Sequence, residues 1–305
     1  MSLTQNTNNF ADRVIDRIQK NNSFLVLGID PNFDLLPEDM RPRYLEKDEI
    51  KDKLWDFVKT LIDTTEDLVC AVKFQSAYFE QFGSWGVRVL AKSVQYAKSL
   101  DIPVIMDAKR GDIGSTSEAY AKAYLNSQKT FKNFEFYSYL DSDAVTVNPF
   151  LGLDTLDNWL EVARQGKGVF VLVKTSNPGS SFIQDAKIGD LTVSQSLANF
   201  INSRAEESVG EHGYSNLGAV VGATKIEDNI DLRSKMPKSL ILAPGIGAQG
   251  GNPDDIRKIV DEHGLGVLVP VSRGISFPEG VSNYSEWVVK IRQNAEELRE
   301  LCKVR

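Results

Sequence analysis

The chain has few residues of the kinds that build disulfide frameworks and metal clusters. Its 305 residues include only two cysteines, Cys70 and Cys302, and two histidines, His212 and His263. Two cysteines are too few for a disulfide scaffold or a zinc cluster, and they fit a reducing cytosolic setting best. The two isolated histidines likewise predict neither a metal site nor a Ser-His-Asp constellation.

An excess of positive charge and long apolar runs are also lacking. The formal net charge is −7, and a negative field opposes binding to nucleic acid, although a small anion can still bind in a cleft with its own Lys and Arg. No apolar stretch approaches the roughly 20 residues of a membrane span, and the Asn-rich segment 1–10 has no signal-peptide pattern. We therefore expect a cytoplasmic protein with no nucleic-acid or membrane partner.

Short runs rich in Val, Ile and Leu alternate with longer amphipathic segments along the chain. This alternation is typical of parallel strands that are each followed by a helix. We expect eight strands, at residues 24–29, 69–74, 102–106, 144–148, 169–173, 217–221, 240–243 and 267–271. Eight strands with room for a helix in every gap predict an α/β fold of the (β/α)8 barrel type, the TIM barrel.

The segments between the strands support the barrel. Apolar residues recur near a 3.6-residue period, which predicts helices at 51–67, 77–99, 117–125, 191–209, 253–263 and 284–303. Two insertions, 32–50 and 126–141, and the polar stretch 179–190 are expected to be loops. Because no low-complexity linker divides the chain, we expect one domain over 1–305, with its core at about 24–275 and a helix at each end. A doubly wound sheet is the structural alternative.

Charged and polar residues stand at the ends of the predicted strands. The carboxyl ends of barrel strands open into one shared mouth, where barrel enzymes carry their active sites. The residues in question are Asp30, Lys73, Asp107, Lys109, Lys174, Ser176 and Arg273. We expect these side chains to converge, although Lys174 has no assigned role.

The densest group is a D-x-K-x-x-D pattern that directly follows the third predicted strand. In an extended chain Asp107 and Lys109 face the same side, and Gly111 allows a turn after which Asp112 begins or caps the next helix. A solvated loop would explain this pattern equally well. Lys73 favours the interpretation of this pattern as a functional site, because a lysine in a buried strand is costly unless carboxylates pair with it.

Six motifs follow one another along the chain. They are LGIDP at 27–31, VKFQ at 72–75, MDAKRGDIGST at 106–116, KTSNPG at 174–179, PGIGAQGG at 244–251 and SRGI at 272–275. In these motifs the chain resembles the orotidine 5'-phosphate decarboxylase family, in its longer-chain bacterial branch. The resemblance implies a homodimeric lyase of de novo pyrimidine (UMP) biosynthesis, with shared active sites and with neither metal nor cofactor.

The resemblance also implies a catalytic tetrad of Lys73, Asp107, Lys109 and Asp112, with Lys109 as proton donor and Asp112 reaching into the partner's site. Loss of CO2 from C6 of the pyrimidine leaves a carbanion with no conjugated sink. A fixed ammonium beside C6 stabilises charge that appears only in the transition state. The two carboxylates would keep both ammonium groups charged and oriented.

The same resemblance implies six substrate-binding residues: Asp30, Thr116, Ser176, Gln249, Arg273 and Gly274. The first two would bind ribose hydroxyls, with Thr116 acting from the other subunit, and Ser176 would read the pyrimidine edge. The last three would bind phosphate, as loops after strands seven and eight of barrels commonly do. A turn residue at Asp30 and a tight turn at the glycines are the plain structural alternatives.

Four other functions are compatible with parts of the pattern. The G-x-G-x-x-G stretch at 245–250 suggests dinucleotide binding, but it follows the seventh strand instead of opening a βαβ unit. A related barrel family uses the same D-x-K-x-x-D segment with a divalent metal on sugar phosphates, where Lys73 would repel the metal. A Schiff-base aldolase using Lys109 or Lys174 would need a depressed amine pKa, which flanking carboxylates oppose. A non-catalytic phosphometabolite-binding barrel would not need the paired lysines and aspartates.

Overall fold

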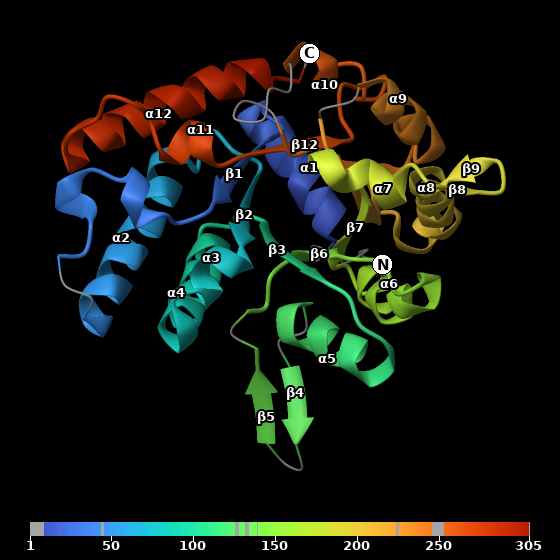
Figure 1. Ribbon diagram of the computed structural model, residues 1–305, viewed down its shortest axis with the longest axis horizontal. Helices are drawn as coiled ribbons and strands as arrows, with labels where there is room; N and C mark the ends of the chain where they lie inside the picture. The colour runs from blue at the N-terminus through green and yellow to red at the C-terminus, as the bar shows by residue number, and fades with distance from the viewer. Residues whose placement is uncertain are drawn as a thin grey trace, which may run out of the picture.

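Eight parallel strands close into a barrel, as the sequence predicts (Figure 1). The computed structural model describes residues 9–43, 46–125, 128–131, 134–138, 140–223, 226–245 and 253–304. Neighbours around the barrel follow the order β1, β2, β3, β6, β7, β10, β11, β12 and back to β1. The strands are β1 (Leu25–Ile29), β2 (Ala71–Gln75), β3 (Val104–Arg110), β6 (Ala144–Val147), β7 (Gly168–Lys174), β10 (Ser215–Val221), β11 (Ser239–Leu242) and β12 (Val267–Val271).

Helices surround the barrel on its outer side. The α-helices are α1 (Phe10–Asn21), α2 (Lys47–Thr65), α3 (Ser76–Glu80), α4 (Gly83–Ser99), α5 (Gly114–Leu125), α6 (Asp157–Arg164), α7 (Ser181–Gln184), α8 (Val193–Ala205), α9 (Ile226–Lys235), α10 (Pro253–Ile256), α11 (Arg273–Ser276) and α12 (Tyr284–Leu301). Short 3-10 turns are η1 (Phe33–Leu35), η2 (Glu38–Met40), η3 (Leu153–Leu156), η4 (Pro178–Ser180) and η5 (Glu206–Ser208). None of the helices in these described ranges is long and apolar enough to cross a bilayer.

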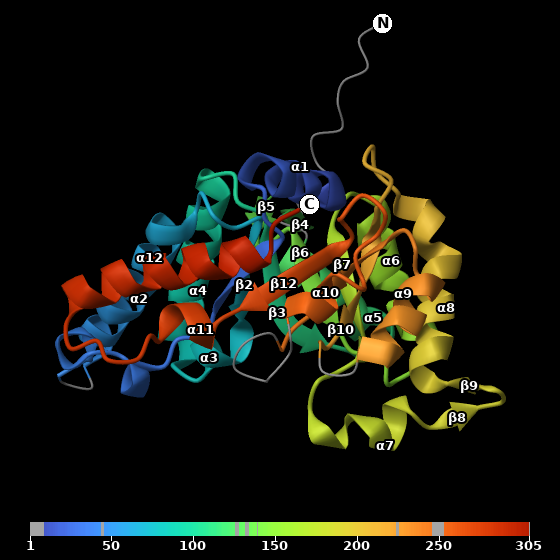
Figure 2. The same ribbon diagram turned by 90° about the horizontal axis from the view of Figure 1, so that it is seen from above.

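Helix α1 covers the amino-terminal end of the barrel. The backbone N–H of Phe10 donates to the carbonyl of Gly166 (2.8 Å), and that of Ala11 donates to Oδ1 of Asn216 (3.0 Å). The ring of Phe10 meets Phe170 of β7 edge to face, with centroids 5.8 Å apart. Because α1 closes this end, the opposite end, where α7 lies, is the open mouth (Figure 2).

Strand register places the functional side chains at neighbouring levels. Gly28 of β1 pairs with Lys73 of β2, and Gln75 of β2 pairs with Asp107 of β3. The barrel strands are buried almost throughout, so apolar residues occupy most of their positions on both faces. A charged residue inside such a strand therefore lies in the barrel or at its mouth.

The structure corrects three predicted segments. The helix predicted at 77–99 is two helices, because Gly83 has a left-handed backbone (φ 62°) at the start of α4. The helix predicted at 253–263 is limited to the four residues of α10 and is followed by turns. The insertion 126–141, predicted as a loop, contains the antiparallel hairpin β4 (Gln128–Phe131) and β5 (Phe134–Tyr137), whose strands pair only with each other among the described residues.

Two regions predicted as loops also carry short elements. The insertion 32–50 contains η1 and η2, and α2 begins before its end. The stretch 179–190 contains α7 and leads into a small antiparallel pair, β8 (Lys187–Ile188) and β9 (Leu191–Thr192). This stretch lies at the mouth end of the barrel (Figure 2).

Candidate active site

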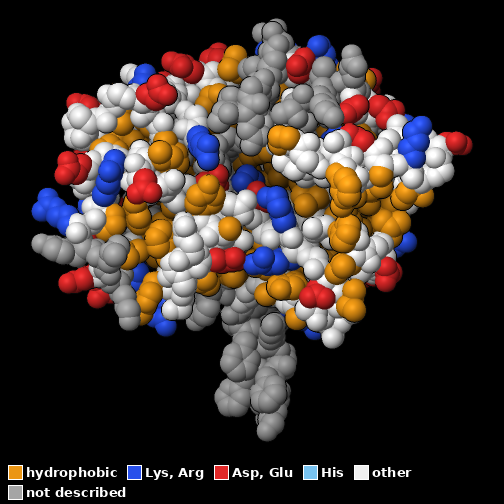
Figure 3. Space-filling model, in the orientation of Figure 1, with side chains coloured by type: hydrophobic (Ala, Val, Ile, Leu, Met, Phe, Trp, Pro, Cys, Tyr) orange, Lys and Arg blue, Asp and Glu red, His pale blue; other side chains and the backbone are white. Residues whose placement is uncertain are grey.

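A cavity of about 520 Å³ opens at the carboxyl ends of the strands. Its volume lies within the range of small-molecule sites, roughly 300–1,000 Å³. In the view towards the mouth, Lys and Arg side chains gather around the central hollow (Figure 3). Of the residues predicted from the sequence, the cavity is lined by Asp30, Lys73, Asp107, Lys109, Ser176, Arg273 and Gly274.

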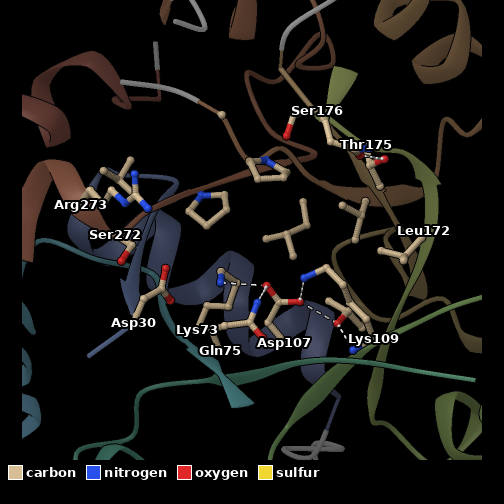
Figure 4. Close-up of a pocket in the computed structure, with 18 of the residues that line it drawn as sticks. Asp30, Lys73, Gln75, Asp107, Lys109, Leu172, Thr175, Ser176, Ser272 and Arg273 are labelled. Carbon is tan, nitrogen blue, oxygen red and sulfur yellow. Dashed lines mark hydrogen bonds and ion pairs between the residues drawn. The ribbon is translucent and has the colours of Figure 1, made fainter. Parts of the chain in front are cut away.

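The carboxylate of Asp107 lies between two ammonium groups (Figure 4). Its Oδ2 accepts a hydrogen bond from Nζ of Lys73 at 2.9 Å, and its Oδ1 accepts one from Nζ of Lys109 at 2.6 Å. Lys73 and Asp107 are buried, whereas the Lys109 side chain is 43% exposed towards the cavity. The exposed lysine can therefore approach a bound molecule while the buried lysine remains paired.

Two further side chains hold Asp107 in place. Gln75 at the end of β2 donates from Nε2 to Oδ2 of Asp107 (3.2 Å), and Thr146 of β6 donates from Oγ1 to its Oδ1 (2.8 Å). The hydroxyl of Thr146 also accepts from the backbone N–H of Lys109 (3.0 Å). The carboxylate is thus fixed from three strands, which gives the array a preorganised geometry.

The backbone at Lys109 is unusual for a residue with a side chain. Its φ is 47°, in the left-handed region, and the register of β3 against β6 shifts between Met106 and Arg110. The sequence predicts that Asp107 and Lys109 face one side through simple alternation. The two side chains do meet, but through this left-handed turn of the strand. Strain of this kind concentrates at functional sites because the surrounding contacts impose it.

The charges of the array determine its protonation. Burial alone would raise the pKa of Asp107, but the charges and hydrogen bonds of Lys73 and Lys109 outweigh it and lower that pKa far below its ordinary value. Burial also acts to lower the pKa of Lys73, yet the charges of Asp107 and Asp30 raise it. The buried pair is therefore an ammonium and a carboxylate at neutral pH.

Polar groups for the rest of a ligand lie on two sides of this array (Figure 4). Asp30 follows β1, and its buried Oδ1 accepts no hydrogen bond from the described residues. Arg273 begins α11 and is exposed, next to Gly274. Ser176 lines the cavity from beyond the end of β7. Gln249 lies outside the described residues.

Two predicted residues are not brought into this cavity. Asp112 and Thr116 lie beyond its lining, and Thr116 is exposed in the first turn of α5. Asp112 does not begin or cap the helix as predicted: α5 starts at Gly114, and Oδ1 of Asp112 accepts from the backbone N–H of Ile113 (2.8 Å). Gly114 begins α5 with a left-handed backbone (φ 50°), two residues after Asp112.

Lys174 departs from the expected convergence. Its side chain is 3% exposed, it does not line the cavity, and its ammonium pairs with Asp185 at the end of α7. An amine buried in this way cannot meet a carbonyl substrate in the cavity. This geometry excludes Lys174 as the nucleophile of a Schiff-base mechanism.

Sequence reasoning missed several residues of the lining. Both Gln75 and Asn177 lie within recognised motifs. Gln75 directly follows a predicted strand, which was a usable indication, whereas Asn177 lies three residues beyond the end of β7 and gave no such indication. Thr146 gave no such indication, because threonine is a common residue in buried strands. Tyr78 and Thr175 also line the cavity.

Comparison with known proteins identifies related sequences. The family model described as "Orotidine 5'-phosphate decarboxylase / HUMPS family" matches residues 25–277. An orotidine 5'-phosphate decarboxylase of Caldicellulosiruptor bescii is 40% identical over 276 residues, which cover 88% of this chain and 90% of that protein. One of Rhodopirellula baltica is 40% identical over 279 residues, covering 90% and 91% respectively.

A solved structure shows the same architecture. The OMP decarboxylase of Leishmania donovani superposes with a TM-score of 0.74 at 29% sequence identity, and the match covers 96% of this chain and 97% of that one. The similarity therefore extends over the whole barrel and its surrounding helices.

Proposed function

This chain belongs to the orotidine 5'-phosphate decarboxylase / HUMPS family, and we propose that it converts orotidine 5'-phosphate to uridine 5'-phosphate and CO2 in pyrimidine biosynthesis. The observation that carries the proposal is the buried Lys73 and Asp107 pair with Lys109 beside it at the cavity. This arrangement presents a fixed ammonium where a carbanion would form.

The proposed mechanism assigns charge stabilisation and protonation to Lys109. As the bond from C6 to the carboxylate breaks, its electron pair remains on C6 and CO2 leaves. The Lys109 ammonium stabilises this developing charge and then transfers a proton to C6, which gives uridine 5'-phosphate. Asp107 and Lys73 keep Lys109 oriented, so no charged group has to reorganise during the reaction.

We propose roles for the remaining groups from their positions. Asp30, whose buried Oδ1 lacks a partner, would accept hydrogen bonds from ribose hydroxyls. Arg273 and the backbone at Gly274 would bind the phosphate. We propose Gln249 as a further phosphate ligand because of the family's motif, since this residue lies outside the described ones. Ser176, on the opposite side of the cavity, would face the pyrimidine.

Metal-dependent chemistry on a sugar phosphate is the closest alternative within the family. It would need a divalent cation near the D-x-K-x-x-D segment. Here the second strand contributes Lys73, whose ammonium lies 2.9 Å from the Asp107 carboxylate that such a cation would use. The donor set therefore favours metal-free decarboxylation, because two ammonium groups would repel the cation.

We further propose a homodimer in which Asp112 and Thr116 complete the partner's site. The loops after β3 and β6 carry exposed large apolar side chains: Ile113, Phe150, Leu151 and Leu153. These loops are adjacent, since the N–H of Asn148 donates to the carbonyl of Arg110 (2.7 Å). An apolar patch beside Asp112 is suited to burial against a second copy.

Mixing two inactive variants tests the shared site. If Asp112 acts in trans, heterodimers of Lys109→Ala and Asp112→Ala contain one intact site and one site with both defects. With random pairing, activity should return to about a quarter of the wild-type value, since half of the dimers carry one working site of two. Heterodimers confirmed by mass spectrometry without any recovered activity would exclude sharing.

We propose that residues 1–305 form one barrel domain and that the protein works in the cytoplasm. Cys70 and Cys302 are both free and buried, which fits a reducing compartment. Helices α1 and α12 pack on the barrel at the two ends of the described chain; for example, the N–H of Phe24 donates to the carbonyl of Cys302 (3.0 Å).

The direct test of the proposed reaction is product analysis with purified protein. Orotidine 5'-phosphate should be converted to uridine 5'-phosphate and CO2 in equal amounts. Folded protein that leaves the nucleotide unchanged but acts on a sugar phosphate with Mg²⁺ would reassign the chain within its family.

A further inference from the structure

The segment that follows β7 forms part of the cavity wall and then leaves the barrel. Thr175, Ser176 and Asn177 line the cavity, and the chain continues through η4, α7 and the β8 and β9 pair. It returns to the barrel at Thr192, the N-cap of α8. We call residues 175–192 the β7 strap; Figure 2 shows its elements at the mouth end of the molecule.

The side chain of Gln184 ties the far part of the β7 strap to its beginning. Its Oε1 accepts from the backbone N–H of Thr175 (2.9 Å), and its Nε2 donates to Oγ1 of Thr175 (2.8 Å). The same hydroxyl donates to Oδ1 of Asn177 (2.6 Å). Gln184 is therefore linked through Thr175 to a residue of the cavity wall, although Gln184 does not line the cavity.

An ion pair whose ammonium is buried anchors the same part of the strap to the barrel. Lys174 ends β7, and its ammonium pairs with Asp185, the residue after Gln184. The hydroxyl of Ser194 in α8 adds a second link, since it donates to the carbonyls of Val173 (2.9 Å) and Gln184 (3.0 Å). The end of α7 is thus held against both β7 and α8.

Ser176 itself packs closely against the residue that follows β10. A Cβ atom at Gly222, beyond the end of β10, would lie 2.9 Å from the backbone nitrogen of Ser176 and 3.0 Å from its Cβ. Only glycine permits this approach without a shift of the chain. Ser176 therefore packs directly against Gly222 and lies in the chain between Thr175 and Asn177, which carry the hydrogen bonds described above.

We propose that Lys174, Gln184 and Asp185 are positioning residues, which hold Ser176 and Asn177 in the place where they meet the pyrimidine before the nucleotide arrives. The inference rests on the proposed function. A long polar segment without these ties would have to be ordered during binding, at a cost in conformational entropy. Apparent affinity falls in proportion to the fraction of chains in the binding-competent form.

This role predicts a separation of KM from kcat. Loss of these contacts lowers the fraction of protein molecules whose β7 strap is in the binding-competent form, but it does not change Lys109 or Asp107. Saturating substrate therefore restores the productive form. In Gln184→Ala we expect KM for orotidine 5'-phosphate to rise about 10-fold and UMP binding to weaken similarly, with kcat within about 3-fold of wild type. Lys174→Met, which removes the anchor without leaving a buried charge, should act in the same direction.

Gln165→Ala is the matched control. Gln165 follows α6, is exposed and donates from Nε2 to Glu161 (3.0 Å), and it does not line the cavity. Its KM and UMP affinity should equal those of wild type. In a Ser176→Ala background, Gln184→Ala should have a smaller effect than in wild type, because both changes act on the same contact.

The outcomes separate this inference from the proposed function. An active wild type with unchanged KM and UMP affinity in Gln184→Ala would overturn the positioning role alone. Additive effects of Gln184→Ala and Ser176→Ala on KM and UMP affinity would also overturn the positioning role. A folded wild type that neither decarboxylates orotidine 5'-phosphate nor binds UMP would instead overturn the proposed function, and the positioning role with it.

Discussion

Replacement of Lys109 by alanine is expected to lower kcat for orotidine 5'-phosphate by about 10⁴-fold or more. The change removes both the charge that stabilises the C6 carbanion and the proton that quenches it, and each effect alone is worth about 10²–10⁴-fold. Because Asp107 keeps Lys73, Gln75 and Thr146 as partners, the rest of the site should persist. Steady-state rates and UMP affinity, measured together, check this expectation.

Lys122→Ala is a suitable control for loss of a lysine. Lys122 lies on α5, is exposed and pairs with Glu118, so its removal should leave kcat unchanged. If Lys109→Ala protein binds UMP normally and keeps more than about a tenth of wild-type kcat, then Lys109 is not central to the mechanism.

Asp107→Asn is the second change with a large expected effect. It would leave Lys73 buried without the carboxylate that compensates its charge, and breaking a buried pair in this way costs about 3–5 kcal/mol of stability. Lys109 would also lose its orienting partner, so we expect kcat to fall by about 10³-fold. Denaturant unfolding and steady-state kinetics measure the two effects separately.

The stability effect of Asp107→Asn should depend on pH in a defined direction. The pKa of Asp107 is lowered in the folded protein, so its carboxylate stabilises the fold above its unfolded pKa of about 3.9 and loses this effect as pH falls. The difference in unfolding free energy between wild type and variant should be constant from about pH 5 to 8 and shrink below about pH 4. A difference that grows towards acid pH would contradict the charge pairing.

The eight barrel strands could be predicted because their sequences reflect burial on both faces. Each is short and mostly apolar, and the eight together have Val, Ile, Leu and Ala at most positions, as a parallel sheet covered by helices requires. The converging residues followed from the same geometry: once the strands are placed, Asp30, Lys73, Asp107 and Arg273 must lie at one mouth. Lys73 was the most informative residue, since a lysine inside such a strand needs a charged partner.

The remaining features depend on contacts between distant parts of the chain. The left-handed backbone at Lys109 coincides with a register shift of β3 against β6, which no local pattern reveals. Lys174 follows a strand just as Asp30 does, yet its ammonium turns to Asp185, eleven residues later. The hairpin of β4 and β5 escaped prediction because its strands are short and pair only with each other among the described residues.

The most direct test of metal-free decarboxylation is the loss of orotidine 5'-phosphate absorbance, with CO2 release, by wild-type protein in EDTA without added cofactor. We predict that kcat and KM equal those measured without chelator, and that added Mg²⁺ changes neither. Turnover that disappears in EDTA and returns with Mg²⁺ would contradict the account, because the array of Lys73, Asp107 and Lys109 would then not be sufficient for the reaction.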